Sequence, residues 1–365
     1  MSKKKPIIVT AIVSVVITLA VSFIFNFITM SDTERLKLLI LSTHTGNVTE
    51  EKLEEGAKRG MIAALGDPYS VYFDEEEYAM FLEEMDASYT GIGVEIQMKD
   101  GKLYVLSPFE GSPAEKAGLR PGDVIEKVDD LTITEETYAE AISRMRNRNT
   151  ETSLVLTVRR DTEILSISVS PETIKIDTVK AENYGDITYI RIRSFDSPTA
   201  GEMKAAIESA EKRNARGLII DVRDNPGGYL ESVADIADML LPQSTIVYTK
   251  NKDGKRESLY ESDGECTQLP IVLLVNENSA SASEVLAGAL KDNGRAKLVG
   301  QKTFGKGSVQ SLFKLRNGGA KITVAEYFTA GGYNINGNGV EPDFVIENTG
   351  EEDMQLKKAL SLFNE

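Results

Sequence analysis

A run of 22 residues without a charged side chain, Ile7 to Ile28, constrains this chain more than any other feature. At 1.5 Å per residue, a helix of this length crosses a hydrocarbon core of about 30 Å. The run exceeds the roughly 7–15 apolar residues of a typical signal peptide, and no clear small-residue cleavage site follows it. Lys3, Lys4 and Lys5 precede the run and Asp32 follows it, so we expect the N-terminus inside the cell. The sequence predicts an uncleaved membrane anchor with the rest of the chain outside the cytoplasm; a cleaved signal peptide is the alternative.

The composition excludes several classes of protein. Residues 31–365 carry a net charge of −19, because 38 Lys and Arg face 57 Asp and Glu. Such a surface repels phosphate backbones, which argues against nucleic acid as a partner. Cys266 is the only cysteine and His44 the only histidine, so the chain cannot form an intrachain disulfide, a multi-cysteine metal site or a histidine cluster. His44 lies in a polar stretch close to the anchor, where we expect a solvated loop residue, so any acid–base chemistry must use another kind of side chain.

Three patterns of secondary structure follow the anchor. Residues 33–85 carry apolar residues at helical spacing, and this segment is one that a second copy of the chain could pair with. Short strands and two helices follow, and beyond residue 173 strands alternate with helices around the wholly apolar strand Ile271–Val275. The pattern predicts an α/β (α+β) fold. Its expected parts are a membrane anchor at 1–30, a helical segment at 31–88, a small β-rich domain at 89–172, a core at 173–349 and a C-terminal helix at 350–365.

The β-rich segment resembles a PDZ domain of the bacterial protease type. The order of its elements, the Gly91–Val94 loop and the stretch Ser112–Asp123 carry the resemblance, and Ser112 with Glu115 forms a helix start. The exposed amides of the loop could receive a peptide's terminal carboxylate while the next strand pairs with the peptide. The candidate peptide-binding residues are Gly91, Ile92, Gly93 and Val94. The alternative is that the glycines only serve a tight turn; Arg146, which ends the second helix, is either a sensor of an occupied groove or a solvated arginine.

Two segments of the core carry side chains suited to catalysis. Asn278–Glu284 places serines where the buried strand gives way to a helix, whose first amides are free to donate. Such a place suits a nucleophile beside an oxyanion hole, although Ser279 or Ser281 as an ordinary N-cap is the alternative. In Lys302–Gln310, glycines bracket Lys306 and let the backbone approach closely.

The second segment also contains a false nucleotide-binding motif. Gly300, Gly305 and Lys306 satisfy the GxxxxGK spacing of a P-loop. However, Gly307 stands where a magnesium-binding Ser or Thr belongs. A strand follows it, whereas a P-loop needs a helix N-terminus to hold the phosphate. The sequence therefore argues against an NTPase.

Lys306 is the natural base for a serine nucleophile, since no histidine is at hand. A lysine with an ordinary pKa of about 10.4 is neutral about once in a thousand near neutral pH, a deficit of about 4 kcal/mol. Burial against apolar neighbours lowers a lysine pKa and recovers much of that deficit. Phe304 and the adjoining strands are the expected apolar wall.

Residues 60–345 resemble the carboxy-terminal processing proteases, a family of tail-specific serine peptidases with a Ser–Lys pair. The resemblance rests on the PDZ-like segment, the two segments above, and the stretches 65–69, 221–228 and 339–343. It implies a crotonase-like α/β protease core with an inserted PDZ domain, N-terminal helices and no metal or cofactor. It also implies a membrane-anchored serine endopeptidase that acts outside the cytoplasm on protein substrates with apolar C-terminal tails. The alternative is a catalytically silent scaffold that only binds tails.

The same resemblance assigns roles to individual residues. The nucleophile falls on Ser281, the general base on Lys306 and the residue that orients the lysine on Gln310. The oxyanion donors fall on the amides of Gly228 and Ala282. Asp292 matches an acidic residue sometimes implicated in the family; a surface aspartate at a helix end is the alternative.

Overall fold

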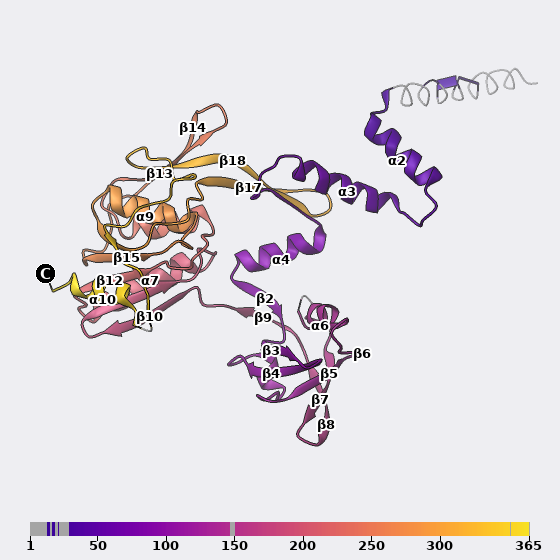
Figure 1. The fold of residues 1–365 in the computed structure, drawn as a ribbon, viewed down its shortest axis with the longest axis horizontal. Coiled ribbons are helices and arrows are strands. Elements are labelled where there is room, and N and C mark those ends of the chain that lie inside the picture. Colours follow the sequence, from indigo (N-terminus) through magenta and orange to yellow (C-terminus); the bar gives the residue numbers. More distant parts are fainter. Residues whose placement is uncertain are drawn as a thin grey trace, which may run out of the picture. The chain divides into compact units, whose positions relative to one another are not determined.

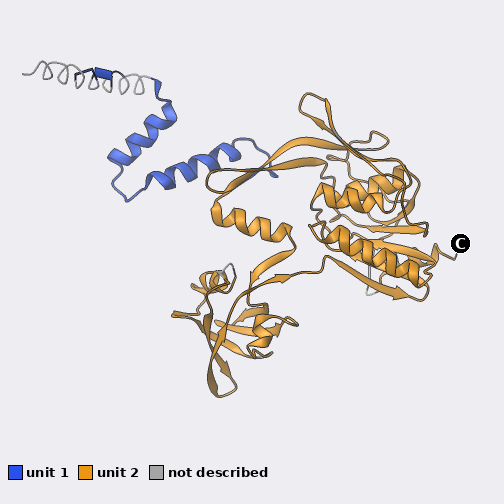
Figure 2. Ribbon diagram, turned by 180° about the vertical axis from the view of Figure 1, so that it is seen from behind, with its two compact units in different colours: residues 1–72 blue, residues 73–365 orange. Residues whose placement is uncertain are grey.

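The computed structural model describes residues 13–14, 17–18, 21, 29–146, 150–350 and 352–364. The expected membrane span at 7–28 therefore lies mostly outside the described residues. Among the residues that are described, no helix combines the length and the apolar character needed to cross a membrane. The chain divides into two compact units, residues 1–72 and residues 73–365 (Figure 2).

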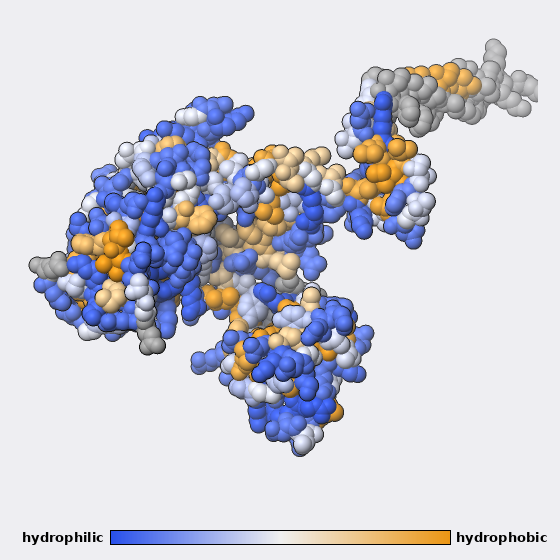
Figure 3. Space-filling view, viewed as in Figure 1, coloured by the Kyte–Doolittle hydropathy of each residue, from blue (hydrophilic) through white to orange (hydrophobic). Residues whose placement is uncertain are grey.

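The first unit contains two amphipathic helices with little core of their own. Helix α2 (Asp32–Thr43) begins at a Ser31–Glu34 capping box, and Thr49 caps α3 (Glu50–Ala63). Strand β1 (Val71–Phe73) crosses into the second unit. No residue of α2 or α3 is buried, and apolar side chains gather on the surface of α2 (Figure 3). His44 ends α2 and is exposed, as expected.

A small β domain follows helix α4 (Glu75–Met85). Its main sheet has the order β3–β4–β5–β7–β8, with β6 paired to β5, while β2 pairs with β9. Ser112 caps α5 as expected, but Glu115 accepts from the Gly111 amide instead of completing a capping box. The elements are β2 (Ser88–Gly91), β3 (Val94–Lys99), β4 (Lys102–Pro108), α5 (Pro113–Lys116), β5 (Val124–Val128), β6 (Leu131–Thr132), α6 (Tyr138–Met145), β7 (Leu154–Arg160), β8 (Glu163–Val169) and β9 (Glu172–Lys175).

A six-stranded sheet of order β10–β11–β12–β15–β16–β19 organises the rest of the second unit (Figure 1). All its pairs are parallel except β10 with β11, so the carboxyl ends of five strands lie at one edge. The strands are β10 (Val179–Tyr184), β11 (Ile187–Ile192), β12 (Gly217–Asp221), β15 (Ile271–Val275), β16 (Ala296–Gly300) and β19 (Phe344–Val345). The expected fully apolar strand is β15, and all five of its residues are buried.

Alternate residues of these strands face two different hydrophobic cores. Leu218 and Ile220 of β12 join the large core that includes α7 (Thr199–Lys212), α8 (Leu230–Asp238) and α9 (Ala282–Asp292). Ile219, between them, joins a second core against α10 (Met354–Ser361). The parallel sheet is therefore covered by helices on both faces, as its continuous apolar strands require.

A second, antiparallel sheet carries part of the candidate site. Within unit 2 its strands run in the order β17–β18–β13–β14. Their bounds are β13 (Thr245–Asn251), β14 (Arg256–Glu261), β17 (Ser308–Lys314) and β18 (Gly319–Thr329). Cys266 lies half-buried between β14 and β15.

Candidate active site

The turn between β15 and α9 holds Ser281 in a strained conformation. Its φ is 55° and its ψ is −113°, a region that costs a residue with a side chain about 1–3 kcal/mol. The surroundings enforce this geometry, because Ser281 is 7% exposed and the first turn of α9 is buried. A strand, a strained turn with a serine and a helix also present the nucleophile of α/β-hydrolases. The backbone thus singles out Ser281 from the neighbouring serines.

Two neighbouring serines fasten this turn to the loop after β12. The Ser279 hydroxyl donates to the Val222 carbonyl at 2.7 Å, and the Ser283 hydroxyl donates to the Asn225 carbonyl at 2.9 Å. The Ala280 amide donates to the same Asn225 carbonyl at 3.0 Å. These bonds bring together two loops that are more than fifty residues apart in the sequence.

Two glycines of the β12 loop pass close to other backbone: Gly227 lies against Ser281, and Gly228 lies against Phe195. Gly227 has φ 110°, and a Cβ there would lie 2.8 Å from the Cβ of Ser281 and 3.0 Å from the Ala282 nitrogen. Gly228 has φ 146°, and a Cβ there would overlap the carbonyl oxygen of Phe195. Only glycine fits at these positions, because both the backbone angles and the space exclude a side chain.

The amides expected to stabilise an oxyanion are available. Phe195 holds the glycine loop: its amide donates to the Gly227 carbonyl at 2.9 Å, and its carbonyl accepts from the Tyr229 amide at 2.6 Å. In the part of the chain that the structure describes, the amides of Gly228 and Ala282 donate to no other group. Free amides beside a serine are what an oxyanion hole requires.

A buried carboxylate joins the serine turn to the lysine loop. Glu284 is fully buried in the first turn of α9. Its Oε2 accepts from the amides of Ser281 and Lys306, at 2.9 and 2.8 Å. Since both nitrogens bond to the same oxygen atom, the distance between them cannot exceed the sum of these two bond lengths. Sequence reasoning missed Glu284; the only signal was a glutamate three residues after a serine in an otherwise small and apolar helix start.

Lys306 lies half-buried on a loop held close to residues 336–339. The Gly305 carbonyl accepts from the Gly337 amide at 2.8 Å, and a Cβ at Gly307 would lie 2.6 Å from the Asn336 Cα. Phe304 is 59% exposed. Most of its ring therefore faces solvent instead of forming the buried apolar wall that we expected beside the lysine.

Gln310 and Asp292 lie on different elements and bond to different groups. Gln310, on β17, donates through Nε2 to the hydroxyls of Ser308 at 2.8 Å and Thr323 at 3.2 Å. Asp292 is the last residue of α9, so about 16 Å of helix separates it from Ser281. It accepts from the Gly331 amide at 2.8 Å. This contact holds the turn after β18 against the end of α9.

The candidate peptide-binding loop of the β domain is well anchored. The Ile92 carbonyl accepts from the Ala114 amide at 2.7 Å, and the Gly93 carbonyl accepts from the Phe109 amide at 2.9 Å. Gly91 forms an isolated antiparallel bridge with Arg146, whose guanidinium lies 5.4 Å from the Tyr89 ring centroid. Arg146 is therefore beside this loop, while Val94 already begins β3.

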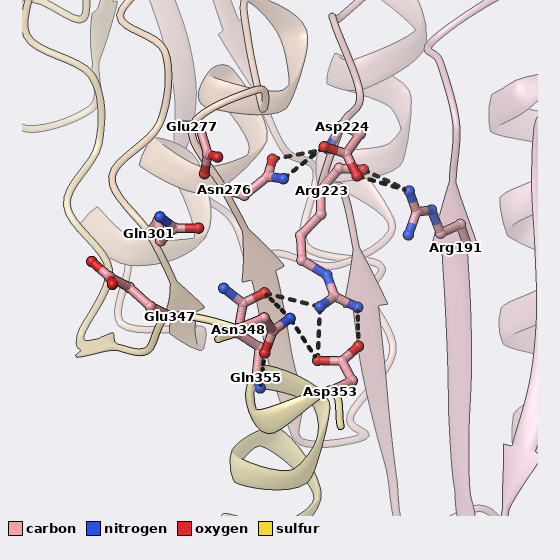
Figure 4. Close-up of a pocket in the computed structure, with 10 residues that line it drawn as sticks. All are labelled: Arg191, Arg223, Asp224, Asn276, Glu277, Gln301, Glu347, Asn348, Asp353 and Gln355. Atoms are coloured by element: carbon pink, nitrogen blue, oxygen red, sulfur yellow. Dashed lines mark hydrogen bonds and ion pairs between the residues drawn. The ribbon is translucent and has the colours of Figure 1, made fainter. Parts of the chain in front are cut away.

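A polar pocket of about 470 Å³ lies at the carboxyl edge of the parallel sheet (Figure 4). Arg223 lines it and donates to Asp353 and Gln355 of the α10 segment. Its guanidinium also donates to Asp221. Burial alone would lower the Arg223 pKa, but the bonds to Asp221 and Asp353 raise it. The pocket walls thus brace the loop that carries Gly227. They are formed by Arg191, Arg223, Asp224, Asn276, Glu277, Gln301, Glu347, Asn348, Asp353 and Gln355.

The same end of the loop is also held through Asp224, the residue after Arg223. Its carboxylate accepts from the side-chain amides of Asn278 at 2.9 Å and Asn276 at 2.7 Å. These bonds lower the pKa of Asp224, so it stays ionised in the neutral range. The β12 loop and the serine turn therefore form one hydrogen-bonded body.

Known protein families match the parts of this architecture. Residues 186–346 match the description "Peptidase family S41", residues 90–170 match "PDZ domain", and residues 29–77 match "Activating protease CtpB N-terminal domain".

Similar proteins cover nearly the whole chain. A protein of Staphylococcus aureus described as "Probable CtpA-like serine protease" is 34% identical over 351 residues, 93% of this chain and 71% of the relative. A protein of Staphylococcus haemolyticus with the same description is 34% identical over 350 residues, 93% of this chain and 70% of the relative. Among solved structures, a photosystem II D1 C-terminal processing protease aligns with a TM-score of 0.55 and 27% identity, covering 93% of this chain and 92% of its own.

Fold, site and relatives together define a serine-type peptidase that carries a PDZ domain. The mixed α/β architecture expected from the sequence is confirmed at this level. More particularly, the chain belongs to peptidase family S41, among the C-terminal processing, CtpA-like serine proteases. The resemblance seen in the sequence is thereby confirmed.

Proposed function

We propose that this peptidase cleaves protein substrates at or near their C-terminal tails, with Ser281 as nucleophile and Lys306 as general base. The observation that carries the proposal is the shared Glu284 oxygen, which keeps the Ser281 and Lys306 amides side by side. The strained backbone of Ser281 and the free amides of Gly228 and Ala282 support it.

The proposed chemistry proceeds through an acyl-enzyme. Neutral Lys306 takes the hydroxyl proton of Ser281 while Oγ bonds to the scissile carbonyl carbon. The amides of Gly228 and Ala282 donate to the resulting oxyanion. Lys306 then gives its proton to the leaving amine as the peptide bond breaks. Water adds to the acyl-enzyme with Lys306 again as base, which releases the acid product and restores the serine.

The PDZ domain is the proposed tail-binding module. Gly91, Ile92, Gly93 and Val94 would receive the terminal carboxylate, while β3 would pair with an apolar tail as an added strand. Gln310 is proposed to orient Lys306. Its position on β17, four residues after Lys306, supports this role.

Location, assembly and core type belong to the same proposal. The uncharged run at 7–28 and the preceding lysines support a single-pass anchor with the peptidase outside the cytoplasm. The exposed leucines of α2 offer a surface for pairing with a second copy. Parallel strands covered by α7, α8 and α9 support a crotonase-like description of the core.

Two substitutions test the proposal directly. Ser281→Ala should abolish cleavage of a tailed protein substrate while tail binding stays intact; unchanged cleavage would indicate a tail-binding scaffold. Lys306→Arg keeps the positive charge but provides no neutral base at working pH, so it should lose turnover as well. Activity of the unsubstituted chain should rise with pH as Lys306 loses its proton, and a flat profile between about pH 5 and 9 would contradict the role of the lysine.

A further inference from the structure

Glu284 makes more contacts than a helix cap needs. Besides the two amides at Oε2, its Oε1 accepts from the Thr303 hydroxyl at 2.6 Å and from the Gly305 amide at 2.7 Å. A capping box would explain only the bond to Ser281, which is the N-cap residue. The other three donors come from the lysine loop, about twenty residues further along the chain.

We infer that Glu284 is a positioning residue that holds the serine turn and the lysine loop in the one arrangement that catalysis needs. The inference rests on the proposed Ser281–Lys306 chemistry and extends it to a residue that touches neither substrate nor reacting atoms. Glu284 acts only through the backbone and the Thr303 hydroxyl.

The first half of the argument concerns Ser281. A strained backbone persists only where its surroundings determine it fully. The bond from the Ser281 amide to Glu284 fixes that amide at the position of strain. Because this bond occupies the Ser281 amide, the amides of Gly228 and Ala282 remain as the oxyanion donors.

The second half concerns Lys306. Two bonds to Glu284, from the amides of Gly305 and Lys306, fix the point from which the lysine side chain extends. Proton transfer depends steeply on the distance between hydroxyl and amine, and a misplacement of about 1 Å can cost roughly 100-fold in rate. A single rigid carboxylate that holds both backbones sets this distance without contacting either reacting group.

Burial explains why the carboxylate form is required. A buried charge is tolerated when hydrogen bonds satisfy it, and the two oxygens of a carboxylate can accept all four of these donors. Glutamine has the same size but replaces one acceptor oxygen with an NH₂ group. Whichever way its amide lies, two donors then face another donor.

The test compares Glu284→Gln with wild type and with Glu208→Gln, the same change at an exposed position of α7. Glu284→Gln should lower kcat for a tailed substrate about 10–100-fold with KM nearly unchanged, as expected when placement alone is disturbed. Glu208→Gln should behave as wild type. The rate of Ser281 labelling by a fluorophosphonate, measured against pH, should have a shifted midpoint in Glu284→Gln, because the surroundings of the base have moved.

Thr303 provides a second route if Glu284→Gln fails to fold. Its hydroxyl donates to Glu284 and accepts from the Val340 amide at 2.7 Å. Thr303→Val keeps the shape and removes the hydroxyl, so kcat should fall about tenfold or more. Thr303→Ser keeps the hydroxyl and should restore kcat and the pH midpoint.

The outcomes separate the inference from the proposed function. Wild-type kcat and pH midpoint in Glu284→Gln, or in Thr303→Val, would overturn the positioning role while an inactive Ser281→Ala still upheld the proposed function. Cleavage by Ser281→Ala would overturn the proposed function, and the positioning role with it.

Discussion

Ser281 differs from its neighbouring serines in its backbone, not in its side-chain chemistry. The hydroxyls of Ser279 and Ser283 donate to carbonyls of the β12 loop, whereas Ser281 has a strained backbone with positive φ next to Gly227. The sequence shows three serines in a small-residue stretch and cannot distinguish them by composition. The strain at Ser281 depends on contacts with a loop fifty residues away, so it becomes visible only in the folded chain.

Replacing Gly228 by alanine tests whether this loop provides an oxyanion donor. A methyl group there would overlap the Phe195 carbonyl and push the loop away from Ser281. We expect kcat to fall about 100-fold or more, as when an oxyanion donor is lost. Steady-state kinetics with a tailed substrate measures this, and binding of the tail peptide should be unchanged.

Gly254→Ala is the matched control for that substitution. Gly254 also has a positive φ, 74°, but a Cβ there meets no atom within 4 Å. It should cost a little stability without affecting kcat. An equal loss of kcat in both variants, or none in Gly228→Ala, would argue against the assigned donor.

At the scale of elements, helix α10 supports the loop after β12, which carries the proposed oxyanion donor Gly228. Arg223 leads into that loop and is bonded to Asp353, which caps α10, and to Gln355 (Figure 4). Burial alone would raise the pKa of Asp353, but the bonds from Arg223 hold it below its usual range. A carboxyl with a lowered folded pKa stabilises the fold above its unfolded pKa of about 3.9, and this contribution is lost as the pH falls further.

Asp353→Asn should therefore destabilise the protein in a pH-dependent way. Asparagine still caps α10, but the guanidinium of Arg223 loses its anionic partner, so unfolding at pH 7 should be easier by about 1–2 kcal/mol. Thermal unfolding at pH 7 and near pH 3 measures the effect. The difference in Tm between the variant and wild type should be smaller at the lower pH. Glu352→Gln, whose exposed partner is Lys357, should change little at either pH. An equal difference in Tm at both pH values would contradict the expected pH dependence of the Asp353 contribution.

The sequence predicts elements better than the contacts between them. The apolar run predicts β15 and the serines before α9 predict the start of that helix, because these signals are local. Arg223 and Asp353 are 130 residues apart, and Glu284 resembles an ordinary capping residue. Neither pairing has a local signature, so both become apparent only when the parallel sheet brings the loops at its carboxyl edge together.

At the scale of the whole molecule, the β domain and the parallel sheet have separate hydrophobic cores. The β domain buries its own cluster, including Leu103 and Leu154, while the parallel sheet has independent cores on its two faces. The β domain can therefore be stable in its own right, whereas the two cores of the sheet share its strands. Residues 31–365 carry a net charge of −19, which repels anionic surfaces, so we assign the proposed membrane attachment to residues 1–30.

Removing residues 1–30 tests that attachment. The full chain should sediment with membranes and resist extraction by high salt, because about 20 apolar residues insert essentially irreversibly. The chain that begins at Ser31 should stay in solution with unchanged kcat on a soluble tailed substrate, since among the described residues no contact of the proposed site involves residues 1–30. Protease added outside intact cells should degrade the full chain if the peptidase faces outward. A full chain that salt washes from the membrane, or one protected in intact cells and degraded only after lysis, would contradict the proposed anchor or its direction.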